Sequence, residues 1–230
     1  MSATRGLFVT GTDTGVGKTV ISLGLMQALQ DRGLSVAALK PVASGCERTP
    51  HGLRNDDALQ LQQQASIPLA YEQVNPYAFE PPIAPHLAAE QAGQTVEINK
   101  IYEIYQYIAS SVDVVIVEGV GGWQVPLNSR ETVADLAHGL GLDICLVVGL
   151  RLGCINHALL SAQAIDHRGC TLAGWVANAL PPTMDALDEN INTLKQKLSS
   201  PLLGVVPVFN NFSVKSVAHC LQQAAPLYTW

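Results

Sequence analysis

The sequence predicts an α/β fold in which a doubly wound, mainly parallel sheet carries helices on both faces. Short β-branched or aliphatic runs alternate along the chain with segments whose apolar residues recur at helical spacing. Hydrophobic residues make up 48% of the 230 residues and charged residues only 14%, which is typical of a protein with many buried strands. No linker, internal repeat or low-complexity segment interrupts the series, so residues 1–230 are predicted to form one domain.

A strand, a loop and a helix open the chain. The apolar run at 7–9 leads into a glycine-bearing loop, and apolar residues at helical spacing follow from 20 to 29. Residues 35–39 predict a second buried strand, which brings Lys40 to its carboxyl end. Such a βαβ unit implies a parallel sheet with a right-handed crossover, and ligands bind beyond the carboxyl ends of its strands. Lys40 is therefore expected on the same edge as the glycine loop.

The later elements continue the alternation. Residues 43–56 are polar and predict a long loop over this edge, before a helix that begins at Asp57. The carboxylate of Asp57 is placed either to cap that helix or to hold a metal. The proline-rich segment 74–86 is predicted to be irregular, with a short helix from about His86. We expect further helices at 98–108, 132–140, 157–166, 184–198 and 213–225, and strands at 112–118, 144–149, 171–178 and 202–206.

The loop after the first strand has the composition of a phosphate-binding P-loop. It reads TGTDTGVGKT over residues 10–19, with Gly15 and Gly17 before Lys18 and Thr19. Backbone N–H groups freed by the glycines, the helix N-terminus and the lysine all attract an anion. The earlier glycine stands one place further back than the usual spacing requires, so an ordinary strand-to-helix turn with a solvated lysine is the alternative.

An acidic residue closes the most strongly β-branched strand of the chain. Glu118 ends the run 112–118 and is followed by glycines, which is the Walker-B pattern for Mg²⁺. The alternative is a glutamate that only marks the strand's exit into solvent. Thr19, Asp57 and Glu118 are the candidate metal ligands. Lys40 adds a second lysine near the γ-phosphate, where it is placed to neutralise another anion such as a carboxylate or a carbamate.

Charge and cysteine content restrict the class of partner and the compartment. The net charge is −6 and no Lys/Arg run occurs, so neither nucleic acid nor an anionic membrane is expected as a partner. No apolar run approaches the roughly 20 residues of a membrane span. The five cysteines are scattered and form no C-x-x-C pair, which favours a reducing, cytoplasmic location.

Five blocks in order resemble one enzyme family, the ATP-dependent dethiobiotin synthetases. They are VTGTDTGVGKT at 9–19, KPVASG at 40–45, VEGVGGW at 117–123, GCINH at 153–157 and GWVAN at 174–178, with PLLG at 201–204 as an extension. The family's loop carries the same extra residue. The resemblance implies a Mg²⁺- and ATP-dependent ligase of biotin biosynthesis. It would join 7,8-diaminononanoate (7,8-diaminopelargonate) and CO₂ to form dethiobiotin through a carbamate and a carbamic-phosphoric anhydride.

The resemblance also implies how ATP and Mg²⁺ are held. Lys18 and Thr14 would contact the phosphates as catalytic residues, and Asn178 would read the adenine. The nucleotide site would be completed by Gly15, Val16, Gly17 and Thr19 of the loop and by Glu118. The metal itself would be held by Thr19, Asp57 and Glu118.

On the substrate side, the resemblance makes Lys40 the catalytic residue that stabilises the carbamate, with Ser44 beside it. Gly153, Cys154 and Asn156, at a helix start, would bind the substrate carboxylate from the neighbouring subunit. A homodimer with shared active sites is therefore implied. A helix N-terminus suits a carboxylate on physical grounds as well.

Other P-loop proteins are the alternatives. A partition-type ATPase switch has a similar fold, but it carries a signature lysine five places before the P-loop lysine, where this chain has Asp13. An amidase-type ligase of the cobyrinic-acid class needs a glutamine amidotransferase domain, for which 230 residues leave no room. A non-catalytic nucleotide-binding module would leave Lys40 as a surface charge.

Overall fold

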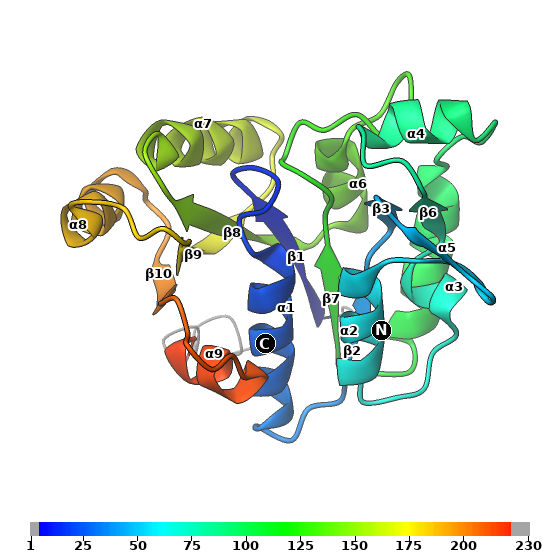
Figure 1. Cartoon of the computed structure of the whole chain (residues 1–230), viewed down its shortest axis with the longest axis horizontal. Helices are drawn as coiled ribbons and strands as arrows, with labels where there is room; N and C mark the ends of the chain where they lie inside the picture. Colours follow the sequence, from blue (N-terminus) through cyan, green and yellow to red (C-terminus); the bar gives the residue numbers. More distant parts are fainter. Residues whose placement is uncertain (1–4, 222–230) are drawn as a thin grey trace.

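A six-stranded parallel sheet forms the centre of the computed structural model, which describes residues 5–221. The strand order is β10-β9-β8-β1-β7-β2, and all neighbouring pairs are parallel. Helices cover both faces (Figure 1), which confirms the predicted fold class. The strands are β1 (Arg5–Gly11), β2 (Val36–Leu39), β7 (Val114–Glu118), β8 (Asp143–Leu150), β9 (Leu172–Ala179) and β10 (Leu202–Val206).

The strand order places three chain segments at one edge. β1 and β2 are not neighbours, because β7 lies between them and pairs with both. Val9 lies opposite Glu118 in one pair, and Leu39 lies opposite Val117 in the other. The residues that follow β1, β2 and β7 therefore leave the sheet side by side at its carboxyl edge.

Within residues 5–221, four helices cover one face of the sheet. They are α1 (Lys18–Gln30), α2 (Asp56–Gln64), α3 (Tyr71–Val74) and α9 (Val214–Cys220). Figure 1 shows α9 beside α1, and apolar side chains of both helices pack in the same buried cluster with alternate residues of the strands. Leu25 of α1, Leu61 of α2 and Val217 of α9 are fully buried there.

Of the helices in the described part of the chain, five lie on the opposite side of the sheet. They are α4 (Pro85–Gln91), α5 (Ile98–Ala109), α6 (Val133–Leu140), α7 (Cys154–His167) and α8 (Leu187–Lys197). Phe8 of β1 and Ile101 of α5 belong to one apolar cluster on this side, and Trp175 of β9 belongs to a second one beneath α7 and α8. Helix α6 starts with a capping box, in which Thr132 and Asp135 bond each other's backbone N–H groups.

Short strands occur in two segments for which the sequence predicts no regular structure. Residues 43–56 were expected to be a long loop, but β3 (Val42–Ser44) enters that segment and β4 (Glu47–Thr49) and β5 (Gly52–Arg54) form an antiparallel hairpin in it. Thr49 closes the hairpin turn, since its hydroxyl donates to the carbonyl of Gly52 and accepts from the N–H of His51. In the proline-rich segment, β6 (Tyr77–Phe79) pairs in parallel with β3.

Several helix boundaries also differ from the prediction. Helix α7 starts at Cys154, three residues before the predicted 157, because Gly153 takes a φ of 95° as its N-cap. Helix α8 starts at Leu187 rather than at 184, after Ala186 with a φ of 51°. Helix α9 ends at Cys220, and the last predicted residues of that helix, 222–225, lie outside the described residues.

Within residues 5–221, no helix is both long and apolar enough to cross a bilayer. All five cysteines lie in this range and are free thiols.

Candidate active site

The predicted phosphate loop connects β1 to α1 at the carboxyl edge of the sheet. Gly15 and Gly17 have positive φ angles of 71° and 88°, a backbone conformation that favours glycine. Gly17 is also the N-cap of α1, so the loop ends at the positive end of the helix dipole. Lys18 begins the helix, and its ammonium donates to the backbone carbonyl of Asp13 at 3.1 Å. The loop thus has the conformation of an anion-binding site.

Neighbouring strands hold the loop in this shape. The buried Asn178, at the end of β9, donates its amide Nδ2 to the carbonyl of Val16 at 2.8 Å. The N–H of Thr12 donates to the carbonyl of Val147 in β8 at 3.0 Å. Asp13 accepts the N–H of Thr14 and forms an ion pair with Arg151, which follows β8. The loop is therefore tied to two strands of the sheet besides its own.

Lys40 lies between two carboxylates. Its ammonium donates to Asp57 Oδ2 at 2.7 Å and to Glu118 Oε1 at 2.6 Å. The hydroxyl of Thr19 donates to the same Glu118 oxygen at 2.8 Å. Lys40 is 5% exposed and Glu118 is fully buried. The structure thus brings the second lysine together with the three candidate metal ligands, as the strand order requires.

Asp57 was considered either as a helix cap or as a metal ligand, and the structure shows that it is not the cap. It lies in the first turn of α2, but the N-cap is Asn55, whose Oδ1 accepts the N–H of Ala58 at 3.2 Å. The carboxylate of Asp57 is therefore not used for capping and is directed to Lys40.

The two lysines have opposite electrostatic surroundings. The pKa of Lys18 is lowered to about 8, mainly by burial and also by the nearby charge of Lys40, against the opposing effect of Glu118. Burial also acts to lower the pKa of Lys40, but Glu118 and Asp57 outweigh it and the pKa is raised. Lys40 similarly outweighs the effect of burial on Asp57, whose pKa is lowered. Of the two lysines, Lys18 therefore has the charge that nearby carboxylates compensate less.

Two polar atoms at the site have no hydrogen-bond partner among the described residues. They are the second carboxylate oxygen of Glu118, Oε2, and the hydroxyl of Ser44, and both are buried. A buried polar atom without a partner is destabilising unless a ligand or ion satisfies it. Carboxylate and hydroxyl oxygens are the ligands that Mg²⁺ prefers, so the set formed by Thr19, Asp57 and Glu118 fits this metal.

A cavity of about 310 Å³ brings most of the predicted residues together. Nine of them line it: Thr14, Gly15, Gly17, Lys18, Thr19, Lys40, Ser44, Asp57 and Glu118. Val16 and Asn178 do not line it, because they pack behind the loop. Sequence reasoning missed Asn55 and Gly121, which also line the cavity. Asn55 could have been recognised from the sequence as the N-cap of the helix that carries Asp57, since asparagine is a preferred N-cap residue.

The predicted carboxylate-binding residues lie elsewhere on the chain. Gly153 and Asn156 are exposed at the start of α7, and Cys154 is buried beneath that helix. None of these residues lines the 310 Å³ cavity. Within one chain, the structure does not bring them together with Lys40.

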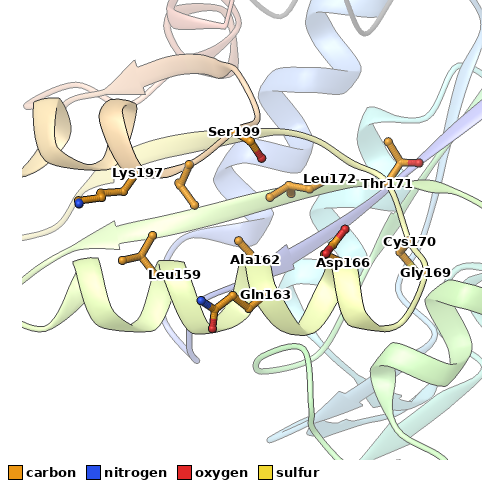
Figure 2. A pocket seen from close by; sticks show the side chains of 11 residues that line it. Leu159, Ala162, Gln163, Asp166, Gly169, Cys170, Thr171, Leu172, Lys197 and Ser199 are labelled. Atoms are coloured by element: carbon orange, nitrogen blue, oxygen red, sulfur yellow. The ribbon is translucent and has the colours of Figure 1, made fainter.

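A larger cavity, of about 600 Å³, lies at the opposite edge of the sheet. Figure 2 shows it between α7, the segment that leads into β9, and the end of α8. Its charged lining residues are Asp166 and Lys197, and none of the predicted site residues lines it. The smaller cavity is the candidate active site, because it alone of the two combines the phosphate loop with the buried charges.

Comparisons with known proteins agree on one enzyme family. The protein-family profile AAA_26, described as an AAA domain, matches residues 5–214. The chain is 57% identical to an ATP-dependent dethiobiotin synthetase of Pseudomonas paraeruginosa over 201 residues, which cover 87% of this chain and 88% of that protein. It is 52% identical to the enzyme of the same name from Cellvibrio japonicus over 203 residues, 88% and 89% of the two chains.

Solved structures share the fold at low sequence identity. A ParA family ATPase from Chlorobium tepidum superposes with a TM-score of 0.58 at 13% identity, over 100% of this chain and 94% of that one. The cell division protein MinD from Aquifex aeolicus gives a TM-score of 0.57 at 16% identity, over 94% and 86%. These likenesses concern the fold alone.

Proposed function

This chain belongs to the family of ATP-dependent dethiobiotin synthetases, and we propose that its reaction takes place in the 310 Å³ cavity at the carboxyl edge of the sheet. The protein is a nucleotide-binding ligase that forms carbon–nitrogen bonds with ATP as co-substrate. The observation that carries the assignment of the site is the buried Lys40, held between Asp57 and Glu118 beside the phosphate loop. The other substrates are 7,8-diaminononanoate and CO₂, and the location is the cytoplasm.

ATP occupies the phosphate loop in this proposal. The N–H groups of Gly15, Val16 and Gly17 and the ammonium of Lys18 bind the phosphates, with Thr14 beside them. The charge of Lys18 is only partly compensated by nearby carboxylates, which supports its role in binding phosphate. Asn178 would read the adenine, and the bond from its Nδ2 to the carbonyl of Val16 holds this side chain beside the loop.

Thr19, Asp57 and Glu118 would hold Mg²⁺, and the unpartnered Glu118 Oε2 supports this assignment. A Mg²⁺ ion there would neutralise negative charge on the β- and γ-phosphates.

The chemistry then needs positioning and charge neutralisation rather than a protein nucleophile. An amine nitrogen of the substrate adds to the carbon of CO₂ and releases a proton, which gives a carbamate. A carbamate oxygen attacks the γ-phosphorus while the bond to the ADP oxygen breaks. The second amine attacks the carbonyl carbon and releases a proton, phosphate leaves, and the cyclic urea closes. Lys40 stabilises the carbamate and the charge that develops during phosphoryl transfer, and Ser44 orients the substrate.

The direct test is product formation. We expect the purified protein to convert 7,8-diaminononanoate, bicarbonate and ATP into dethiobiotin, with one ADP formed per dethiobiotin as measured by mass spectrometry. Removal of Mg²⁺ with EDTA should stop the reaction, and added Mg²⁺ should restore it. Hydrolysis of ATP without dethiobiotin, whether or not the diamine is present, would contradict the proposal and favour an ATPase switch.

We further propose that the protein is a homodimer with shared active sites. Gly153, Cys154 and Asn156 would bind the substrate carboxylate at the start of α7 in the neighbouring subunit. Two features of the chain support this: the start of α7 is exposed, and it does not reach the cavity of its own chain. Leu152, which is 96% exposed, lies next to it.

Shared sites predict that two inactive variants restore activity when they are combined. Lys40→Gln removes the catalytic lysine, and Asn156→Asp places a negative charge at the carboxylate site. In a mixed dimer, one site has both defects and the other has neither. Random assembly after co-expression should therefore recover about a quarter of the wild-type activity per subunit. Activity no higher than that of the separate variants would mean that each chain carries a whole site.

A further inference from the structure

Two buried side chains outside the cavity connect the backbone of Lys40 to the helix that carries Asp57. The hydroxyl of Tyr71 accepts the N–H of Asn55 at 2.7 Å and donates to Asn75 Oδ1 at 2.9 Å. Asn75 in turn donates its Nδ2 to the backbone carbonyl of Lys40 at 2.8 Å. Tyr71 is 7% exposed and Asn75 is 2% exposed.

This chain of hydrogen bonds closes into a ring through the active site. Asn55 is the N-cap of α2, so the bond from Tyr71 fixes the start of the helix. Asp57 in the first turn of that helix accepts the ammonium of Lys40 at 2.7 Å. The backbone N–H of Lys40 is also held, by the carbonyl of Val74 at 2.7 Å. Both ends of the Lys40–Asp57 contact are thus fixed by the short helix α3 and the residue that follows it.

We propose that Tyr71 and Asn75 are positioning residues for the synthetase reaction, which set the place of the Lys40 ammonium relative to Asp57 and Glu118. Neither residue lines the cavity, so both act through Lys40 and α2. The inference rests on the proposed role of Lys40 in phosphoryl transfer.

The geometry gives Tyr71 one defined orientation. The guanidinium of Arg54 lies over its ring at 4.1 Å from the centroid. Burial raises the pKa of the phenol, so the hydroxyl keeps the proton that it donates to Asn75. Because the Tyr71 hydroxyl both donates and accepts, movement of either segment breaks one of its two hydrogen bonds, which couples the two segments.

Tyr71→Phe is the principal test. It should lower kcat for dethiobiotin formation by roughly 10- to 100-fold, because a small misplacement of a catalytic group has an effect of that order. The KM for ATP should change by less than about twofold, since the contacts of the phosphate loop do not involve Tyr71. A purely structural role would instead lower the melting temperature and the fraction of protein that binds ATP, and would leave kcat per ATP-binding site unchanged.

Tyr105→Phe is the matched control. Tyr105 is 6% exposed, close to the value for Tyr71, but its hydroxyl has no hydrogen-bond partner among the described residues. Loss of that hydroxyl should leave kcat and KM unchanged. If Tyr71→Phe behaves like Tyr105→Phe while the wild-type protein makes dethiobiotin, the positioning proposal is wrong. If the wild-type protein makes no dethiobiotin, the proposed function itself is wrong.

Asn75→Leu provides an independent variant and a double-mutant cycle. Alone, it should lower kcat as Tyr71→Phe does. If the two residues act as one unit, the double variant should lose no more than about twofold beyond the more damaging single variant. Losses that multiply would show that the residues act separately, which would overturn the proposed relay.

Discussion

Lys40→Gln is expected to reduce dethiobiotin formation by roughly 10²- to 10³-fold in kcat, while nucleotide binding persists. The magnitude is that of removing one preorganised group that stabilises charge in a transition state. Lys40 is the cation that lies between Asp57 and Glu118, and its replacement leaves both carboxylates without it. Lys18 and the loop backbone remain to bind ATP. The measurement is kcat by mass spectrometry of dethiobiotin, beside the Kd for ATP by calorimetry.

The same substitution is expected to destabilise the fold. Breaking one side of a buried ion pair costs roughly 3–5 kcal/mol, and we expect the lower end because glutamine keeps a hydrogen-bond donor. Lys100→Gln is the control, since Lys100 is exposed on α5, where its Nζ lies 5.2 Å from the centroid of the Tyr77 ring. Its kcat and free energy of unfolding should match the wild type. A Lys40→Gln enzyme with near-normal kcat would refute the assigned role.

Gly17→Ala is expected to weaken ATP binding by at least about tenfold and to destabilise the protein. Gly17 has a φ of 88°, a conformation that costs an alanine roughly 1–2 kcal/mol. The added Cβ would also overlap the amide nitrogen of Asn178. That amide is buried and bonded to the carbonyl of Val16, so it cannot move without releasing the loop. Calorimetry for the Kd of ATP and urea unfolding for stability measure the two effects.

Gly33→Ala separates the two contributions. Gly33 has a similar φ, 82°, but among residues 5–221, its two chain neighbours aside, no atom lies within 4 Å of the position that a Cβ would take. The Gly33→Ala variant should therefore lose only the stability that corresponds to the strained backbone, and it should bind ATP normally. Equal losses for the two variants would mean that the contact with Asn178 does not support the loop.

The cluster of buried charges at the site could be predicted because its members follow three parallel strands. The runs of residues before Lys18, Lys40 and Glu118 are long or strongly apolar, so the three strands could be recognised from the sequence. The carboxyl ends of parallel strands meet at one edge of the sheet, which brings these residues together. The pairing order was not evident: the expected β1–α1–β2 unit is interrupted in space by β7. Sequence periodicity reports that a strand is buried, but not which strand lies beside it.

Short elements and contacts between distant residues escaped prediction for a different reason. Strands β3 to β6 have three residues each, too few for an alternating pattern to be distinguished from a loop. In the link from Tyr71 through Asn75 to Lys40, the last bond joins residues that are 35 positions apart, and it depends on the fold of α3. Nothing in the spacing of these residues indicates that link before the chain is folded.

The place of β7 between β1 and β2 also determines when the site comes into being as the chain folds. The strands that precede Lys18 and Lys40 are synthesised first, yet they do not pair with each other. A long segment must be closed before Glu118 reaches them, and such non-local closure is a slow step with a large entropy cost. A nascent chain shorter than 118 residues therefore lacks one of the two carboxylates that pair with Lys40, and the charged cluster is complete only when the middle of the sheet is filled.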